Sequence, residues 1–244
     1  MKARGIVIAL CIFCLASGYA FAQSGTVFSV GVSYWRAALE FEFEEEDEFD
    51  VDWSIKPANL LGPYANVRLG NLVLGGSMFT GTFVVDFGDL FDIWDTKYDL
   101  KIKRTDLNFS AGYSLSRNLT LFGAYKDMTY KFEESLTYED YWTGYETTEK
   151  DEWEEKGSFV GGGLSLVFPF PGSSLFAYGS AAYLSAQKED WSNITTLTVG
   201  LGMALQPNLS AMVGYRVDSS SNDDEEGITE KIKGITATLA YTFR

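Results

Sequence analysis

The sequence predicts an all-β fold: a transmembrane antiparallel up-and-down β-barrel of about ten strands, with short turns at one end and long acidic loops at the other. Three observations predict it. Apolar residues alternate with small or hydroxylated ones, tight turns alternate with long polar links, and charges are nearly missing from the centres of the alternating segments. An alternation with period two is typical of a β-strand, whose successive side chains point to opposite faces.

The alternation is clearest in four segments, 107–115, 197–205, 209–217 and 235–243. Large apolar residues occupy one face, and mostly glycine, alanine, serine and threonine occupy the other. A face of small residues suits the crowded interior of a narrow barrel, and the large face then meets lipid. A soluble β-sandwich is the alternative fold, but its outward face would carry charge. In the last segment the odd positions hold Ile235, Ala237, Leu239, Tyr241 and Phe243.

Turn residues divide the chain into ten candidate strands. The tight turns at 70–71, 116–118, 171–174 and 207–208 all fall at one end, whereas the long links carry most of the acidic residues. One such link, rich in glutamate, is predicted between 136 and 157. The candidate strands are 26–43, 58–69, 72–87, 97–115, 119–136, 157–170, 175–187, 194–206, 209–219 and 230–243.

The first candidate strand changes the parity of its apolar residues. Phe28 to Tyr34 are apolar at even positions, whereas Ala37 to Phe43 are apolar at odd ones. Two interpretations remain open: a β-bulge near Trp35, or a strand that extends beyond the bilayer.

Residues 1–22 predict a signal peptide that is removed. Lys2 and Arg4 precede an apolar run, and Ala20-Phe21-Ala22 offers small residues at the two positions that signal peptidase reads. Both cysteines lie in this segment, so the mature chain, one domain over 23–244, has neither disulfide nor thiolate chemistry. A membrane anchor over 5–22 is the alternative, although its apolar run is short for a span.

Composition excludes several classes of function. A formal net charge of -15 argues against a nucleic-acid partner, because phosphate repels such a surface. The chain has no histidine, which removes every mechanism with an imidazole base and the commonest ligand of catalytic zinc. We therefore expect no enzyme, no cofactor and no metal centre.

These features resemble those of the bacterial outer-membrane β-barrel proteins, here a small porin-like barrel, over residues 26–244. The resemblance implies a place in the cell outer membrane of a Gram-negative bacterium. It also implies contact with membrane lipid and lipopolysaccharide, and insertion by the outer-membrane assembly machinery. Short turns would face the periplasm and the acidic loops would face outwards. In that family the final residue is commonly an aromatic recognised during assembly; Phe243, one place before the end, is the candidate here.

The resemblance also bears on enzymes. The ten-stranded omptin proteases share the inferred architecture, but the activity of that family depends on a histidine, as does that of barrel phospholipases and lipid deacylases. This chain lacks the residue.

Parity predicts which charged residues face the interior. Buried charges need partners or water, so they indicate either a narrow pore with a basic constriction or a polar network that plugs the barrel. Gly161-Gly162-Gly163, inside a strand, predicts interior space or close packing. The charged candidates are Arg68, Arg104, Asp106, Lys126 and Arg216.

Aromatic residues near strand ends predict girdles at the two membrane interfaces. The ordinary preference of aromatics for strands is the alternative interpretation. The candidates are Tyr34, Tyr113, Tyr125, Tyr183 and Tyr241, together with Trp35 and Trp191.

Two functions of different class follow. One is an integral outer-membrane barrel, either a narrow pore for small solutes or a plugged structural barrel. The other is a surface binding or adhesion protein that acts through its acidic loops, with divalent cations as possible partners. The acidic runs 44–48, 151–155 and 223–226 offer oxygen ligands, but none has the spacing of an EF-hand, and solvated loops are the default interpretation.

Overall fold

The structure is a computed structural model that describes residues 26–42, 54–87, 96–139, 145–188, 191–221 and 229–243. The predicted signal peptide over 1–22 lies outside the described residues, as do the acidic runs 44–48 and 223–226. Within the described ranges, no helix has the length and apolar character needed to cross a membrane.

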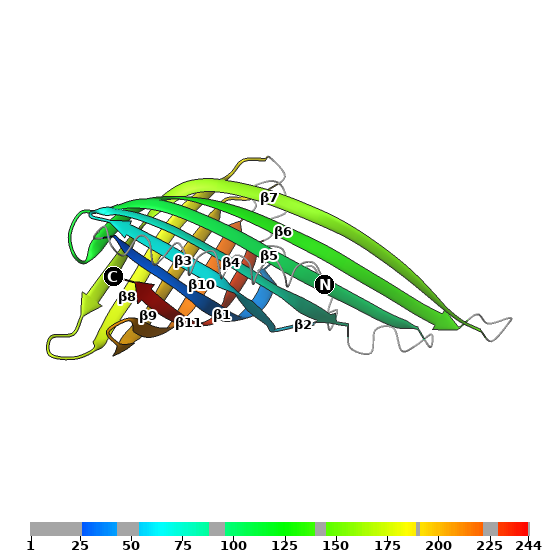
Figure 1. The fold of residues 1–244 in the computed structure, drawn as a ribbon. Helices are drawn as coiled ribbons and strands as arrows, with labels where there is room; N and C mark the ends of the chain where they lie inside the picture. Colours follow the sequence, from blue (N-terminus) through cyan, green and yellow to red (C-terminus); the bar gives the residue numbers. More distant parts are fainter. Residues whose placement is uncertain are drawn as a thin grey trace.

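The described chain forms a closed antiparallel β-barrel (Figure 1). Strand β1 pairs with β3 on one side and with β11 on the other, which closes the sheet, and β2 only adds a short pairing along β4. The predicted all-β, ten-stranded up-and-down barrel is confirmed. The strands are β1 (Val27–Glu42), β2 (Ser54–Lys56), β3 (Ala58–Leu69), β4 (Leu72–Asp86), β5 (Lys97–Ser114), β6 (Leu119–Glu139), β7 (Glu146–Pro169), β8 (Leu175–Ala186), β9 (Ile194–Gln206), β10 (Leu209–Ser221) and β11 (Thr229–Phe243).

Tight turns join the strands at one end of the barrel, which we call the turn end; the opposite end is the loop end. Leu69 pairs with Leu72 across the first turn, where Gly70 has a φ of 61°, a conformation that side chains disfavour. In the second turn, the hydroxyl oxygen of Ser116 accepts hydrogen bonds from the backbone N–H groups of Asn118 and Leu119.

The exterior near the turn end is apolar. On β5 the outward positions from Leu107 to Leu115 are exposed and apolar, apart from the small Ala111, and on β9 Leu201 is 60% exposed. Beyond Leu107, towards the loop end, the outward positions of β5 become polar, with Thr105, Lys103 and Lys101. Nine residues of tilted strand cover roughly 20 Å, close to the height of a lipid-facing band.

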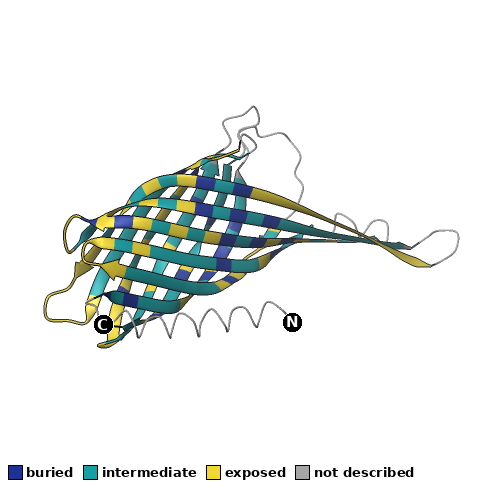
Figure 2. Ribbon diagram, turned by 45° about the horizontal axis from the view of Figure 1, so that its top comes forward, coloured by how far each residue is buried: buried dark blue, intermediate teal, exposed yellow. Residues whose placement is uncertain are grey.

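The interior near the loop end is packed with buried apolar side chains. Every barrel strand except β10 contributes at least one of them, among which Trp35, Leu60, Phe83 and Phe159 are fully buried. We call this set the apolar cluster. Figure 2 shows the buried residues as a band that crosses the strands between the turn end and the projecting strands at the loop end.

The structure shows why the apolar residues of β1 change from even to odd positions. Its register with β11 and with β3 runs without interruption, so the strand has no bulge at Trp35. Near the turn end Val32 faces outwards, whereas near the loop end Trp35 and Leu39 are buried inside and Arg36 is exposed. The strand therefore continues past the apolar exterior into a zone with an apolar interior and a polar surface.

Strands β6 and β7 are longer than the sequence predicted. β6 ends at Glu139 and β7 begins at Glu146, so the predicted loop between 136 and 157 is wrong. The two strands pair along their whole length, while β7 pairs with β8 only from Phe159 onwards. Figure 1 shows β5, β6 and β7 projecting beyond the other strands. We call residues 97–103, 130–139 and 146–156 the sheet extension.

Cross-strand pairs hold this charged segment as a sheet. The rings of Phe132 and Trp153 stack with centroids 4.8 Å apart, and the hydroxyls of Thr137 and Thr148 are hydrogen bonded at 3.0 Å. Lys131 Nζ lies 2.8 Å from Glu152 Oε2. Hydrogen bonds to Glu152 and Glu133 raise the pKa of Lys131 above its ordinary value.

Candidate functional site

Six charged side chains meet inside the barrel, beside the apolar cluster. We call them the charged layer. On β5, its member Asp106 lies between outward Thr105 and Leu107, the level at which the exterior changes from polar to apolar. The layer consists of Arg104 and Asp106 on β5, Lys126 on β6, Arg216 and Asp218 on β10, and Glu230 on β11.

The layer contains two Arg-x-Asp pairs, and each pair lies on one strand. Residues two apart on a strand share a face, so the guanidinium and the carboxylate both point inwards. Arg104 Nε and Nη2 donate to Asp106 at 2.7 and 2.9 Å, and Arg216 makes the same bidentate contact with Asp218 at 2.8 Å for both bonds. Bidentate, charge-assisted bonds fix both partners in one geometry.

The remaining contacts cross the interior. Lys126 Nζ lies 2.8 Å from Asp218 Oδ2 and 3.3 Å from Asp106 Oδ2. Arg104 Nη1 lies 3.3 Å from Glu230 Oε1, and the hydroxyl of Tyr130 donates to the same carboxylate. Three cations meet three carboxylates, so the layer is neutral and joins β5 and β6 to β10 and β11.

Aromatic contacts join the charged layer to the apolar cluster. The guanidinium of Arg216 lies 4.7 Å from the ring centroid of Trp35 and 5.7 Å from that of Phe79, and Arg104 lies 5.2 Å from the ring of Tyr130. Such cation–π contacts strengthen when water is excluded. The charged layer and the apolar cluster are therefore in direct contact inside the barrel.

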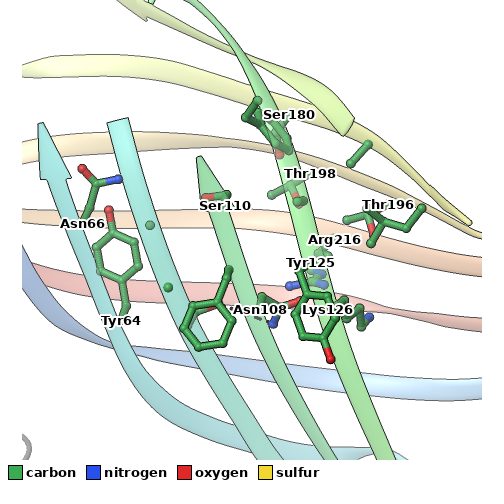
Figure 3. A pocket seen from close by; sticks show the side chains of 18 residues that line it. Tyr64, Asn66, Asn108, Ser110, Tyr125, Lys126, Ser180, Thr196, Thr198 and Arg216 are labelled. Atoms are coloured by element: carbon green, nitrogen blue, oxygen red, sulfur yellow. Dashed lines mark hydrogen bonds between the residues drawn. The ribbon is translucent and has the colours of Figure 1, made fainter. Parts of the chain in front are cut away.

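A cavity with polar and apolar walls, which we call the turn-end cavity, occupies the interior on the turn-end side of the charged layer. It consists of two adjoining spaces of about 260 and 410 Å³, which share Tyr64, Asn66 and Ser110 in their walls. Figure 3 shows Lys126 and Arg216 together at one end of the first space and Tyr64 and Asn66 at the other. The interior is thus hollow near the turn end and filled near the loop end.

Four of the five interior candidates meet in the layer, and Arg68 does not. Its guanidinium is exposed at the turn end, where Nη2 donates to Ser114 Oγ at 2.8 Å. The expected excess of positive charge is also wrong, because Asp218 and Glu230 balance the cations. Asp218 and Glu230 were not among the interior candidates, although both lie within predicted strands, 209–219 and 230–243. The Arg-x-Asp spacing shared with Arg104 and Asp106 was the signal that could have found Asp218.

The five candidate girdle tyrosines face outwards in two groups. Tyr34, Tyr125 and Tyr183 lie towards the loop end of the apolar exterior, and the Tyr34 hydroxyl donates to Asn59 Oδ1 at 2.7 Å. Tyr113 and Tyr241 lie near the turn end, where their hydroxyls accept hydrogen bonds from the turn residues Asn71 and Asn208.

The two tryptophans proposed for the girdles lie elsewhere. Trp35 is fully buried, because its position in β1 has inward parity. Trp191 packs against the apolar cluster, where its ring stacks on Tyr130 with an interplanar angle of 6°. Phe243, the assembly candidate, ends β11 and stacks on Phe28 with centroids 5.9 Å apart.

Of the three acidic runs, only 151–155 lies among the described residues, and it is part of β7 rather than a loop. Glu152 and Glu154 pair with Lys131 and Lys156. In the part of the chain that the structure describes, no three acidic side chains are gathered in a way that could hold a metal ion.

No family model and no curated protein sequence matches the chain. Among solved structures, the outer membrane protease OmpT of Escherichia coli aligns over 89% of this chain and 97% of its own, with a TM-score of 0.54 and 15% identity. This chain has the fold of the bacterial outer-membrane β-barrel proteins.

Two further outer-membrane barrels align less closely. A FadL homologue of Pseudomonas aeruginosa covers 89% of this chain and 90% of its own, with a TM-score of 0.43 and 10% identity. Ail, the attachment invasion locus protein of Yersinia pestis, covers 88% and 97%, with a TM-score of 0.38 and 12% identity.

The comparison corrects one expectation from the sequence. We expected no enzyme, but a solved outer-membrane barrel with this architecture is a protease. The fold therefore occurs in an enzyme, and the expectation that excluded an enzyme is wrong. At 15% identity the likeness concerns the fold.

Proposed function

We propose that this outer-membrane barrel is a closed structural barrel, not an open pore, and that it acts at the cell surface through its sheet extension. One observation carries the proposal: the charged layer bonds opposite walls of the barrel to each other across the interior. Lys126 on β6 reaches Asp218 on β10, with three strands between them along the sheet. An open constriction would instead leave these charges to water.

The surface of the barrel supports a membrane orientation. The apolar exterior meets lipid, and the two groups of outward tyrosines form the girdles at its edges. The turn end faces the periplasm, and the sheet extension and the acidic loops face the outside. Phe243, at the end of β11, is the residue that the assembly machinery reads.

Outward lysines support contact with lipopolysaccharide. Lys101 and Lys103 are exposed on β5 just beyond the apolar exterior, and Lys103 pairs in register with Lys131 on β6. Lysines at that height meet the phosphates of the outer leaflet. Divalent cations bridge the same phosphates to neighbouring carboxylates such as Asp99, which is exposed on the same face.

Current across a planar bilayer tests the proposal. The mature chain is refolded in detergent, its compact barrel is verified by heat-modifiable gel migration, and the protein is inserted into the bilayer. We expect a flat baseline. Discrete, reproducible current steps from the folded protein would show a pore and overturn the proposal.

A further inference from the structure

The sheet extension has a free edge on β7. β7 pairs with β6 from Glu146 onwards but with β8 only from Phe159 onwards. Among the described residues, the backbone of Glu146–Glu155 pairs with no strand other than β6, and at this edge only the N–H of Glu152 has a side-chain partner, Asp151 Oδ1, at 2.9 Å. Figure 1 shows β7 as the outermost strand of the extension. An unpaired edge presents a row of N–H and C=O groups that can pair with another strand.

This edge is strongly acidic. Between Glu146 and Glu155 there are six acidic residues and one lysine. Lys131 and Lys156 neutralise Glu152 and Glu154 on the outward face. On the opposite face Glu149, Asp151 and Glu155 alternate along β7, and the six lysines of the extension all stand at outward positions.

An aromatic pair adds a second feature to the acidic face. Trp153 lies between Asp151 and Glu155, stacks on Phe132 and remains 40% exposed. An exposed indole ring flanked by carboxylates attracts cations through its face as well as through the charges. The neighbouring hydroxyl of Tyr98 is held by Glu134, and burial together with that hydrogen bond raises the pKa of Tyr98.

The negative charge of the β7 edge determines which kind of strand can pair with it. A second copy of β7 would bring another set of like charges directly opposite, and such pairs destabilise a sheet. A basic strand would gain backbone hydrogen bonds and charge pairs together.

We propose that the β7 edge, Glu146–Glu155, docks an extended basic segment of a partner polypeptide, which adds to the extension as a further strand. This inference rests on the proposed function, because it requires the extension to be at the cell surface. Lysine or arginine side chains at alternate positions of the added strand meet Asp151 and Glu155, and one lies over the exposed ring of Trp153.

The first test uses the refolded full barrel in detergent and three labelled ten-residue peptides. The probes are an alternating Lys-Thr peptide, the same peptide N-methylated at every second residue, and an alternating Glu-Thr peptide. By fluorescence anisotropy, the Lys-Thr peptide should bind. The N-methylated form should bind more than about tenfold more weakly, because it loses backbone bonds while keeping its charge. Equal binding of both basic peptides, or no binding of either, would overturn the inference.

The second test uses variants that keep the shape of the side chains. Asp151→Asn with Glu155→Gln should weaken binding of the Lys-Thr peptide by about fivefold or more. Glu40→Gln with Asp86→Asn, which removes two carboxylates from β1 and β4 outside the β7 edge, is the matched control and should leave binding unchanged. An equal loss in the control would show attraction by net charge alone and overturn the inference.

The closed barrel and the docking of a basic segment at the β7 edge are tested by independent measurements. The current measurement decides whether the barrel is closed, whatever the peptides do. A dimer of barrels that forms without peptide and dissociates when the β7 carboxylates are neutralised would assign the edge to a second copy and overturn the inference.

Discussion

Lys126 and Asp218 lie on different walls of the barrel, yet their charged atoms are 2.8 Å apart across its interior. Asp218 also holds Arg216 by two hydrogen bonds, so one carboxylate contacts two cations of the charged layer. Burying three charges is tolerated only while each keeps its partner. The stability of the barrel and the closure of its interior therefore depend on the same residue.

Replacing Asp218 by asparagine should destabilise the barrel strongly. The change keeps the size of the side chain but leaves Arg216 facing a neutral group and Lys126 with Asp106 as its remaining carboxylate, and breaking a buried pair costs about 3–5 kcal/mol. The urea midpoint of the refolded protein measures this loss. Asp99→Asn on the outer surface should change stability by less than about 0.5 kcal/mol. Equal midpoints for Asp218→Asn and the parent protein would contradict the prediction.

Removing one sector of the filled cross-section should open the barrel. The triple variant Trp35→Ala, Arg216→Ala and Asp218→Ala removes the largest interior side chain of β1 and the two charged side chains of β10, where the arginine lies over the indole ring. The turn-end cavity should then connect with the loop end, and small current steps should appear across a planar bilayer. Arg68→Ala, at the turn end, should remain silent. A folded triple variant without steps would show that closure does not depend on this sector.

Period-two alternation was sufficient to predict the barrel and most of its interior charges. Arg104, Asp106, Lys126 and Arg216 share inward parity with small residues of their strands, and the structure places all four together. Parity alone does not tell how far along the axis a residue lies. That is why Arg68, on the inward face but at the turn end, was grouped with the other four.

The β7 part of the sheet extension could not be predicted by the same reasoning, although 97–103 and 130–136 lie within predicted strands. Its inward and outward faces both carry charge, so 146–156 shows no apolar alternation and was taken for a loop. What holds it as a strand is pairing with β6, including the stack of Phe132 on Trp153. In β1, the apolar face moves from outside to inside once the strand passes beyond the apolar exterior, and a fixed parity rule cannot follow that change.

A charge at the centre of the apolar exterior should be costly. Leu201 on β9 is 60% exposed in the isolated chain and is surrounded by Val199 and Met203 on the same face. Leu201→Arg should destabilise the folded barrel in lipid vesicles by about 2–4 kcal/mol, the cost of a cation at the midplane of a bilayer. Urea titration followed by tryptophan fluorescence measures the change.

The matched control lies beyond the apolar exterior. Thr82 is exposed on β4 and pairs in register with Lys103, at the level where charges already occur. Thr82→Arg should be close to neutral, because the side chain meets water or head groups. Equal costs for the two substitutions would contradict the membrane orientation proposed here.

The glycine triplet of β7 offers a test of packing inside the barrel. A Cβ at Gly161 would overlap the carbonyl oxygen of Tyr183 and lie 2.8 Å from the Cα of Leu184, both on the neighbouring β8 backbone. Backbone cannot move aside as a side chain can, so Gly161→Ala should cost about 1–3 kcal/mol. Gly162 faces outwards, and its Cβ would meet only the carbonyl oxygen of Phe122, at 3.0 Å.

Gly162→Ala is therefore the control, with an expected change below about 1 kcal/mol, within the range of strand propensities. Both variants are compared by the temperature at which the compact form disappears on a gel, after heating in detergent. A clear loss for Gly161→Ala alone would show that β7 and β8 approach too closely for any side chain between them. Equal temperatures for the two variants would contradict that close approach, because the severe overlap with the β8 backbone arises at Gly161 and not at Gly162.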